Sequence, residues 1–132
     1  VVGRDTIHYL DGGRGPTVVL LHGIFAEKDH WVDFARALTG TRRVIVPDLP
    51  GFGASTKRRG DDYRYPAQVE RLEAFARALR LDTVDLAGSS MGGAIATLWT
   101  VRHPARVRSL AYIGAPHGIA TPRRSPFETA IA

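Results

Sequence analysis

Short apolar runs alternate with amphipathic segments along most of the chain. Four runs are almost continuously apolar and have the length of a short strand: 17–21, 43–46, 83–87 and 107–113. Runs of this kind are typical of strands that are buried on both faces of a sheet. An earlier stretch, 6–10, alternates only in part and leads into a Gly-rich segment at 11–16, so it predicts a strand followed by a turn.

The segments between these runs have the periodicity of helices. Apolar residues recur at helical spacing in 31–38, which precedes Gly40, and again in 66–79. An Ala- and Gly-rich segment, 91–102, ends before Pro104. Strands that alternate with helices at this spacing predict an α/β fold, with a mostly parallel sheet and flanking helices. In such sheets the functional groups gather at the carboxyl ends of the strands.

The composition narrows the classes of function. The chain has 132 residues, of which 44% are hydrophobic and 23% are charged, as in an ordinary globular domain. It has no cysteine, which excludes disulfides, thiolate metal sites and cysteine nucleophiles. No apolar run is long enough to span a bilayer, and no signal-like segment opens the chain. The formal net charge is +5, but the arginines are scattered, so we expect no nucleic-acid partner. These features leave the compartment open, with the cytoplasm favoured.

The segment VDLAGSSMGGAI, residues 84–95, carries the clearest chemical signal. Gly88, Ser90 and Gly92 fit a Gly-x-Ser-x-Gly pattern, whereas Ser89 would have Ala87 and Met91 at the two positions where this pattern has glycine. In that pattern a sharp strand-to-helix turn lifts the central serine out of the sheet, and glycines are needed because the chain crowds itself there. A Gly-rich packing turn and a phosphate-binding loop are the alternatives, the second disfavoured because no lysine follows the glycines.

A serine nucleophile needs a base, and it needs donors for the negative charge that develops on the substrate oxygen. The helix that begins at Met91 offers its first backbone N–H, aided by the helix dipole. A second donor is expected in the turn His22-Gly23-Ile24-Phe25, which directly follows an apolar run. Gly23 allows the backbone to turn, and the N–H of Ile24, or else that of Phe25, is the candidate. We expect the His22 ring to shape this turn by hydrogen bonding to its backbone.

Four segments, in this order and spacing, resemble the α/β-hydrolase superfamily: LLHGIF, PDLPGFGAS, LAGSSMGG and HPARVRSLAYIGA. The resemblance covers residues 6–118 and points to bacterial lipases and monoacylglycerol-lipase-like enzymes. It implies a serine hydrolase that cleaves carboxylic esters, such as acylglycerol or fatty-acyl esters, through an acyl-enzyme and without a cofactor or a metal. The partner that it implies is a small-molecule ester, lipid esters included, and the oligomeric state stays open.

The same resemblance assigns roles to single residues. Ser90 would be the catalytic nucleophile, and the backbone N–H groups of Ile24 and Met91 would form the oxyanion hole. Asp48 would be a structural residue of the loop after its strand and not the acid of a triad. A serine at the nucleophile position differs from the aspartate that dehalogenases and epoxide hydrolases of this fold use. The candidates for the lining of a substrate pocket are Phe25, Ser89 and His117.

The acid and the base that would complete a triad are not evident. In this family they follow the nucleophile, and the downstream histidines and acid are His103, His117 and Glu128. His103 ends a helix, away from the catalytic edge, and His117 follows a strand other than the last. We therefore expect the amino-terminal part of a hydrolase core at 1–118 and the start of a cap or lid at 119–132. The triad would be incomplete and this chain inactive alone, and its last strand would expose an unpaired edge.

Two other classes of function remain open. A carbon–carbon bond hydrolase or an acyltransferase of the same fold would use the same serine with a different pocket. A non-catalytic binding member would keep the fold and lack the base. An Asp and then a His, each after a later apolar run of the full reading frame, would separate the enzymes from the binding protein.

Overall fold

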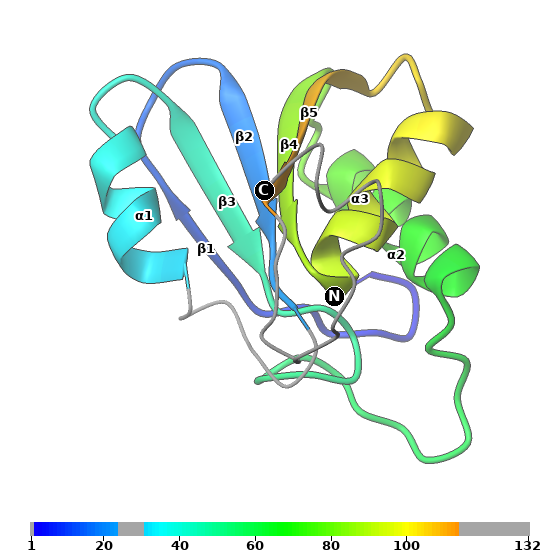
Figure 1. Cartoon of the computed structure of the whole chain (residues 1–132). Helices are drawn as coiled ribbons and strands as arrows, with labels where there is room; N and C mark the ends of the chain where they lie inside the picture. Colours follow the sequence, from blue (N-terminus) through cyan, green and yellow to red (C-terminus); the bar gives the residue numbers. More distant parts are fainter. Residues whose placement is uncertain (1, 24–30, 114–132) are drawn as a thin grey trace, which may run out of the picture.

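The computed structural model describes residues 2–23 and 31–113, which form a five-stranded sheet with helices on both faces (Figure 1). The elements are β1 (Tyr9–Gly12), β2 (Thr17–Leu21), α1 (Val32–Leu38), β3 (Arg43–Pro47), α2 (Tyr65–Ala78), β4 (Val84–Ser89), α3 (Met91–Arg102) and β5 (Val107–Ile113). The strand order is β1-β3-β2-β4-β5, with β1 antiparallel to β3 and the other pairs parallel. The expected α/β fold with a mostly parallel sheet is therefore confirmed. The segment 119–132, expected to begin a cap, lies outside the described residues.

Side chains on the central strands alternate between two hydrophobic clusters, one on each face of the sheet. Val19 and Leu21 of β2 point into the cluster that α2 and α3 cover. Val18 and Leu20 of the same strand point into the cluster that α1 covers. Because β2 is buried on both faces, it needs apolar residues at nearly every position, which explains its continuous apolar run.

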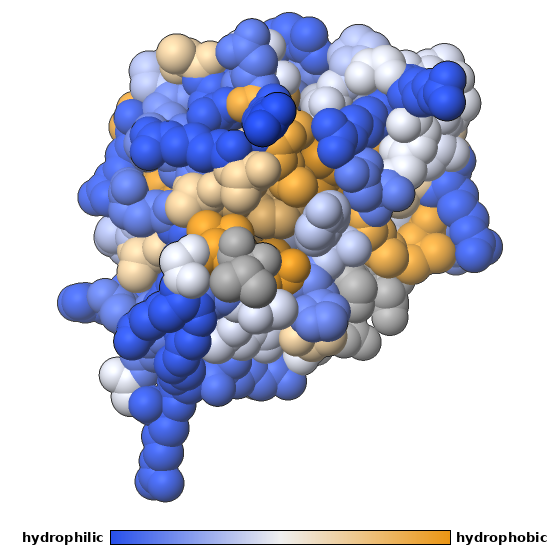
Figure 2. Space-filling model, turned by 180° about the vertical axis from the view of Figure 1, so that it is seen from behind, coloured by the Kyte–Doolittle hydropathy of each residue, from blue (hydrophilic) through white to orange (hydrophobic). Residues whose placement is uncertain are grey.

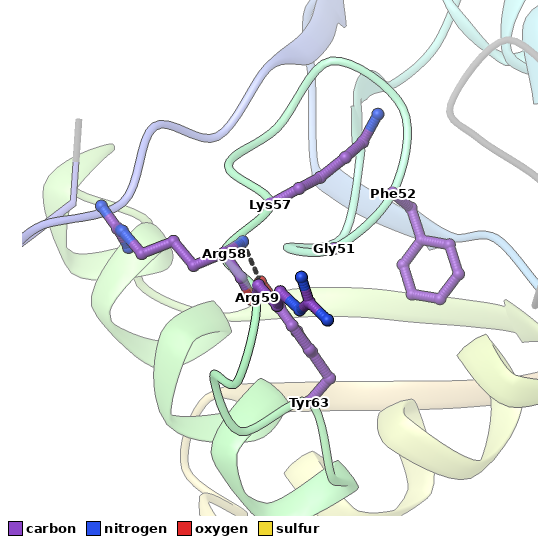
Figure 3. A pocket seen from close by; sticks show the side chains of 6 residues that line it. All are labelled: Gly51, Phe52, Lys57, Arg58, Arg59 and Tyr63. Atoms are coloured by element: carbon purple, nitrogen blue, oxygen red, sulfur yellow. Dashed lines mark hydrogen bonds between the residues drawn. The ribbon is translucent and has the colours of Figure 1, made fainter.

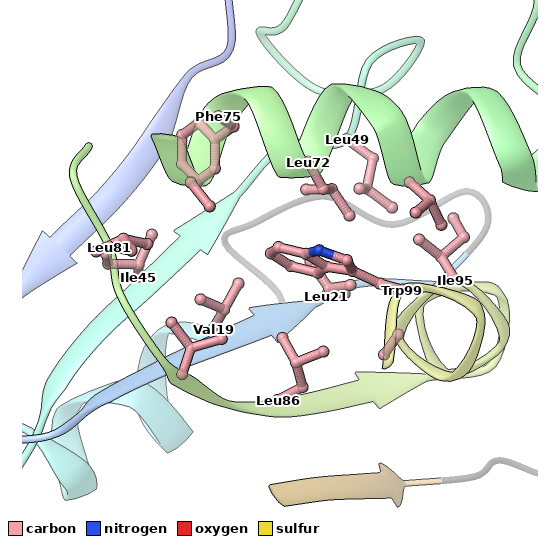
Figure 4. Packing of buried hydrophobic residues seen from close by; sticks show 14 of the residues in the cluster. Val19, Leu21, Ile45, Leu49, Leu72, Phe75, Leu81, Leu86, Ile95 and Trp99 are labelled. Carbon is pink, nitrogen blue, oxygen red and sulfur yellow. The ribbon is translucent and has the colours of Figure 1, made fainter. Parts of the chain in front are cut away.

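The larger cluster lies between the sheet and the helices α2 and α3. Its centre is the fully buried Trp99 of α3, which packs among Leu72 of α2 and Leu21 of β2 (Figure 4). Burial of a side chain such as Leu72 contributes about 1.5–3 kcal/mol to stability. This packing fixes α3 against the sheet, and α3 begins at the residue directly after Ser90.

The first strand begins later than the sequence pattern predicts. The pattern placed a strand at 6–10, whereas β1 starts three residues later and includes the first two residues of the expected turn. The backbone N–H groups of Thr6 and His8 donate to the hydroxyls of Thr56 and Ser55. This stretch is therefore tied to the loop after β3, and only the residues that follow it pair with β3 itself.

The strand β5 lies at the edge of the sheet and is more exposed than its apolar run predicts. The expected bounds are correct, but most of its residues are exposed, including Leu110 at 38% and Ile113 at 39%. Within the described ranges β5 pairs with β4 alone, so one side of its backbone has no neighbouring strand. The expected unpaired edge is thus present among these residues. Figure 2 shows apolar side chains exposed in the middle of one face of the molecule, bordered by hydrophilic ones.

Candidate active site

The helices that follow β2 and β4 in the chain lie on opposite faces of the sheet: α1, after β2, covers one face, and α3, after β4, covers the other. The two strands are neighbours, and Leu21 at the end of β2 pairs with Gly88 of β4. Such a divergence between adjacent parallel strands is the usual place for a ligand site in an open α/β sheet. A site is therefore expected where β2 and β4 end.

Ser90 occupies a strained turn between β4 and α3. Its φ of 53° and ψ of −116° lie outside the regions that residues with side chains usually adopt. Ser90 is exposed, whereas Gly88 and Gly92 on either side of it are buried. A Cβ at Gly88 would overlap the carbonyl of Gly92, and a Cβ at Gly92 would overlap that of Leu21. This is the crowding expected around a serine in a sharp strand-to-helix turn.

The turn after β2 lies directly against Ser90. A Cβ placed on Gly23 would come within 3.3 Å of both the Ser89 carbonyl oxygen and the Ser90 Cβ. The fold thus brings together two glycine-bearing turns that are far apart in the sequence. Met91 is buried at the first position of α3, where the helix dipole favours negative charge. The other residues predicted for this site lie outside the described residues: Ile24, Phe25 and His117.

His22 is fully buried and both of its ring nitrogens have backbone partners. Nδ1 lies 2.8 Å from the carbonyl oxygen of Gly23, and Nε2 accepts the N–H of Leu49 at 3.0 Å. Since a carbonyl can only accept, the proton sits on Nδ1 and the ring is neutral. The ring joins the turn after β2 to the loop after β3, which is the kind of bonding that the sequence predicts for it.

Asp48 organises the loop after β3. It is fully buried, and its Oδ2 accepts the N–H of Ala54 at 2.9 Å. Its backbone carbonyl accepts the hydroxyl of Ser55 at 2.6 Å, and a Cβ on Gly53 would overlap its carboxylate. These contacts tie the carboxylate into its own loop, as expected for a structural residue.

The same loop borders a hollow of about 350 Å³. It is lined by Gly51, Phe52, Lys57, Arg58, Arg59 and Tyr63 (Figure 3). The Phe52 ring contacts the His22 ring edge-on, with the centroids 5.4 Å apart. The Arg58 guanidinium donates to Asp5 at 2.7 Å, which fixes the far part of the loop. Phe52 and His22 therefore connect this hollow to the turn beside Ser90.

Within the described residues, no histidine ring is placed to take a proton from Ser90. His22 uses both nitrogens in the backbone contacts above. His103 follows α3 at the end opposite to Ser90, about 18 Å away for a 12-residue helix. His8 precedes β1, and β1 is separated from β4 by two strands, which places His8 about 14 Å away.

The strongest pKa shifts among the carboxylates lie away from Ser90. Hydrogen bonds from Arg108, and further from Arg42, outweigh burial and hold the pKa of Asp85 well below its usual range. Asp85 pairs with Val18 of β2, so its side chain lies on the face of the sheet that α1 covers. There its carboxylate forms ion pairs with Arg42 and Arg108. Hydrogen bonds from Arg64 lower the pKa of the exposed Asp62 to about 2. Neither carboxylate is suited to be a base for Ser90.

Tyr112 of β5 also lies beside Ser90, although no motif in the sequence marks it as a site residue. Its hydroxyl is 3.3 Å from the backbone carbonyl oxygen of Ser90, and its ring lies over Gly93. In the sequence Tyr112 is the one aromatic residue of the apolar run 107–113. Its presence there does not indicate which other residue its side chain contacts.

The described part of the chain offers no metal site. In residues 2–23 and 31–113, no group of three His, Asp or Glu side chains is placed to hold a metal ion. None of the helices in these ranges has the length and apolar character needed to cross a membrane.

The site lies in a segment that matches a known family. The family model described as the alpha/beta hydrolase fold matches residues 16–129. The chain belongs to this family. The strand-to-helix turn at Ser90 and the turn at Gly23 are thus parts of an α/β-hydrolase core, as the sequence motifs predict.

Relatives of this α/β hydrolase include lipases and another class of hydrolase. The chain is 34% identical to monoacylglycerol lipase abhd6-A of Xenopus laevis over 117 residues, which are 87% of this chain and 34% of the relative. It is 40% identical to 2-hydroxy-6-oxo-2,4-heptadienoate hydrolase of Pseudomonas putida over 108 residues, 80% of this chain and 39% of the relative. The solved structure of a bacterial membrane phospholipase A matches with a TM-score of 0.83 and 42% identity, covering 97% of this chain and 42% of that one. The expected similarity to lipase-like enzymes is confirmed, and the chain spans only about two fifths or less of each of these proteins.

Proposed function

We propose that this chain carries the nucleophile of a serine hydrolase that cleaves carboxylic esters, with acylglycerol or fatty-acyl esters as the substrate class. The observation that carries the proposal is the strained, exposed Ser90, held between Gly88 and Gly92 where no Cβ fits. The names of a monoacylglycerol lipase and a phospholipase among the similar proteins support the substrate class.

In the proposed reaction the Ser90 Oγ attacks the carbonyl carbon of the ester while its proton passes to a base. The electron pair of the carbonyl π bond moves to the oxygen, and the resulting oxyanion accepts the N–H of Met91 and that of Ile24. Collapse of this intermediate expels the alcohol, which takes the proton from the base, and leaves the acyl group on Ser90. Water then releases the acid by the same steps. The base is one that the described residues do not include.

The backbone N–H groups suit this task because they are fixed before the reaction begins. The Met91 N–H is at the start of a helix that Trp99 and its neighbours hold against the sheet. A donor that needs no reorganisation stabilises the transition state more than the ground state, and removal of one such donor costs about 10²–10³ in kcat. The turn at Gly23, in contact with Ser90, supports the second donor in Ile24.

A carbon–carbon bond hydrolase is the second candidate function. The observation that favours it is the 40% identity to the heptadienoate hydrolase. This enzyme would use the same Ser90 and the same backbone donors on a ketone in place of an ester. An acyltransferase and a non-catalytic binding protein remain as further alternatives.

The test is to label the full-length protein with a fluorophosphonate and to map the adduct by mass spectrometry. We expect one adduct, on Ser90 and not on Ser89, and we expect Ser90→Ala to remove it and to lower kcat for a monoacylglycerol by at least about 10⁴-fold. Ser109→Ala, a serine that donates to Asp85 on β4, is the matched control and should keep the label.

The same assay separates the competing functions. Turnover of 2-hydroxy-6-oxo-2,4-heptadienoate, the compound in the name of the Pseudomonas putida relative, but not of esters would favour the carbon–carbon bond hydrolase. A full-length protein that takes no label, and has no turnover of either substrate, would favour a binding protein. Ester turnover that survives Ser90→Ala would contradict the proposal.

A further inference from the structure

Tyr112 is placed to contact the turn at Ser90 from the neighbouring strand. It pairs with Gly88 across the β4–β5 ladder, so its side chain lies on the face of the sheet that α3 covers. A Cβ on Gly93 would come within 2.6 Å of Cδ2 and 2.8 Å of Cζ of the Tyr112 ring. The ring therefore occupies the space directly over the first turn of α3.

The hydroxyl of Tyr112 reaches the backbone of Ser90 itself. It donates to the Ser90 carbonyl oxygen at 3.3 Å. The same carbonyl accepts the helical N–H of Ala94 at 3.1 Å. Two donors from two different elements, β5 and α3, thus hold one carbonyl in a residue whose own backbone is strained.

The carbonyl of Ser90 and the N–H of Met91 are two ends of one planar peptide unit. A contact that fixes the direction of the carbonyl also fixes the direction of the N–H. A second hydrogen bond to the carbonyl further polarises the peptide, which makes its N–H a better donor. In the proposed function this N–H is the donor to the oxyanion, where orientation before the reaction matters most.

We propose that Tyr112 is a positioning residue of the oxyanion hole, acting through the Ser90–Met91 peptide. The inference rests on the proposed function of Ser90. The hydroxyl of Tyr112 orients and polarises the peptide, and its ring packs on Gly93 and keeps the first turn of α3 in place.

The test is Tyr112→Phe in the full-length protein, because phenylalanine keeps the ring over Gly93 and removes only the hydroxyl. We expect kcat for an ester to fall about 3- to 10-fold, with KM changed less than about twofold. A boronic acid that forms a tetrahedral adduct on Ser90 should bind more weakly by the same factor as kcat/KM falls. The midpoint of thermal unfolding should stay close to that of the wild type.

Thr100→Val is the matched control, because the Thr100 hydroxyl also donates to a backbone carbonyl, that of Ala96 at 2.8 Å, in the part of α3 away from Ser90. Its kcat and boronate affinity should match the wild type. Wild-type kcat in Tyr112→Phe would overturn the inference, as would a lower kcat with unchanged boronate affinity.

Ser90→Ala, measured beside these variants, distinguishes the two proposals. If Ser90→Ala is inactive and Tyr112→Phe behaves as the wild type, only the role of Tyr112 is wrong. If Ser90→Ala keeps its turnover, the proposed function is wrong and the role of Tyr112 fails with it.

Discussion

At the scale of single residues, the backbone geometry of Ser90 depends on the absence of side chains at Gly88 and Gly92. A backbone conformation of this kind costs about 1–3 kcal/mol and persists only where the surroundings impose it. The carbonyls of Leu21 and His22 lie so close to Gly92 that no side chain fits there. The strained serine is thus held by close backbone packing between α3 and the end of β2.

Gly92→Ala should therefore damage both stability and the site. We expect the free energy of unfolding to fall by about 1–3 kcal/mol, because the added methyl group must push α3 away from β2. Labelling of Ser90 by a fluorophosphonate should slow sharply for the same reason. Gly40→Ala is the control, since a Cβ at Gly40 meets nothing within 4 Å, and its effect should stay within about 0.5 kcal/mol. Urea unfolding of both variants measures these free energies. Equal stability of the two variants would show that the close backbone contacts at Gly92 do not exclude a side chain.

At the scale of elements, one buried carboxylate joins α2, α3 and the segments before β4 and β5. Glu73 of α2 accepts the indole N–H of Trp99 in α3 at 2.8 Å and the guanidinium of Arg106, before β5, at 2.8 Å. Arg106 also donates to the carbonyls of Leu81 and Asp82, before β4. Burial alone would raise the pKa of Glu73, but the hydrogen bonds from Arg106 and Trp99 outweigh it and lower the pKa.

Glu73→Gln should lower the free energy of unfolding by about 2–4 kcal/mol at pH 7, because it leaves the Arg106 charge without its carboxylate partner. Since the pKa of Glu73 is lowered on folding, its contribution is full above the usual glutamate pKa of about 4.3. That contribution is lost as the pH falls through the lowered value, so the difference between Glu73→Gln and the wild type should shrink below about pH 4. Denaturant unfolding across pH 3–7 measures this difference.

Glu70→Gln is the control for that series, because the Glu70 side chain is 62% exposed and, among the described residues, forms an ion pair with His103 alone. It should change stability by less than about 0.5 kcal/mol at any of these pH values. A Glu73→Gln protein as stable as Glu70→Gln at pH 7 would mean that the buried network does not join the elements.

At the scale of the whole molecule, the edge of the sheet formed by β5 favours association between chains. Among the described residues, β5 has no neighbouring strand on the side away from β4, and its apolar side chains Leu110 and Ile113 are more than a third exposed. An exposed apolar edge strand of this kind is a template for pairing with a second chain.

The 132-residue chain should therefore self-associate in a concentration-dependent way. Replacing Leu110 and Ile113 together by Lys should reduce this association, because charges on an edge strand oppose pairing. Val101→Lys is the control, as Val101 is 72% exposed but lies on α3 and not on the edge strand. Light scattering after size-exclusion chromatography measures the mass. A monomeric wild-type chain at all concentrations would refute the prediction.

The sequence by itself determined the features whose cause is local. The apolar run of β2 and the helical spacing of α2 follow from periodicity, and Ser90 follows from the glycines that its turn requires. The His22 turn could be placed beside Ser90 because parallel strands share one carboxyl edge. The roles of Ser90, Ile24 and Met91 remain predictions, as do the pocket roles of Phe25, Ser89 and His117.

Only the tertiary structure decided what depends on strand order, register and contacts between distant segments. β1 starts later than its pattern predicts because hydroxyls of the loop after β3 bind the backbone of Thr6 and His8. β5 has the composition of a buried strand but lies at the edge, since burial depends on which elements cover a strand. The contact of Tyr112 with Ser90 arises from the pairing of β5 with β4 and the packing of α3 above both. Local pattern limits which element forms, whereas long-range packing determines which side chains meet.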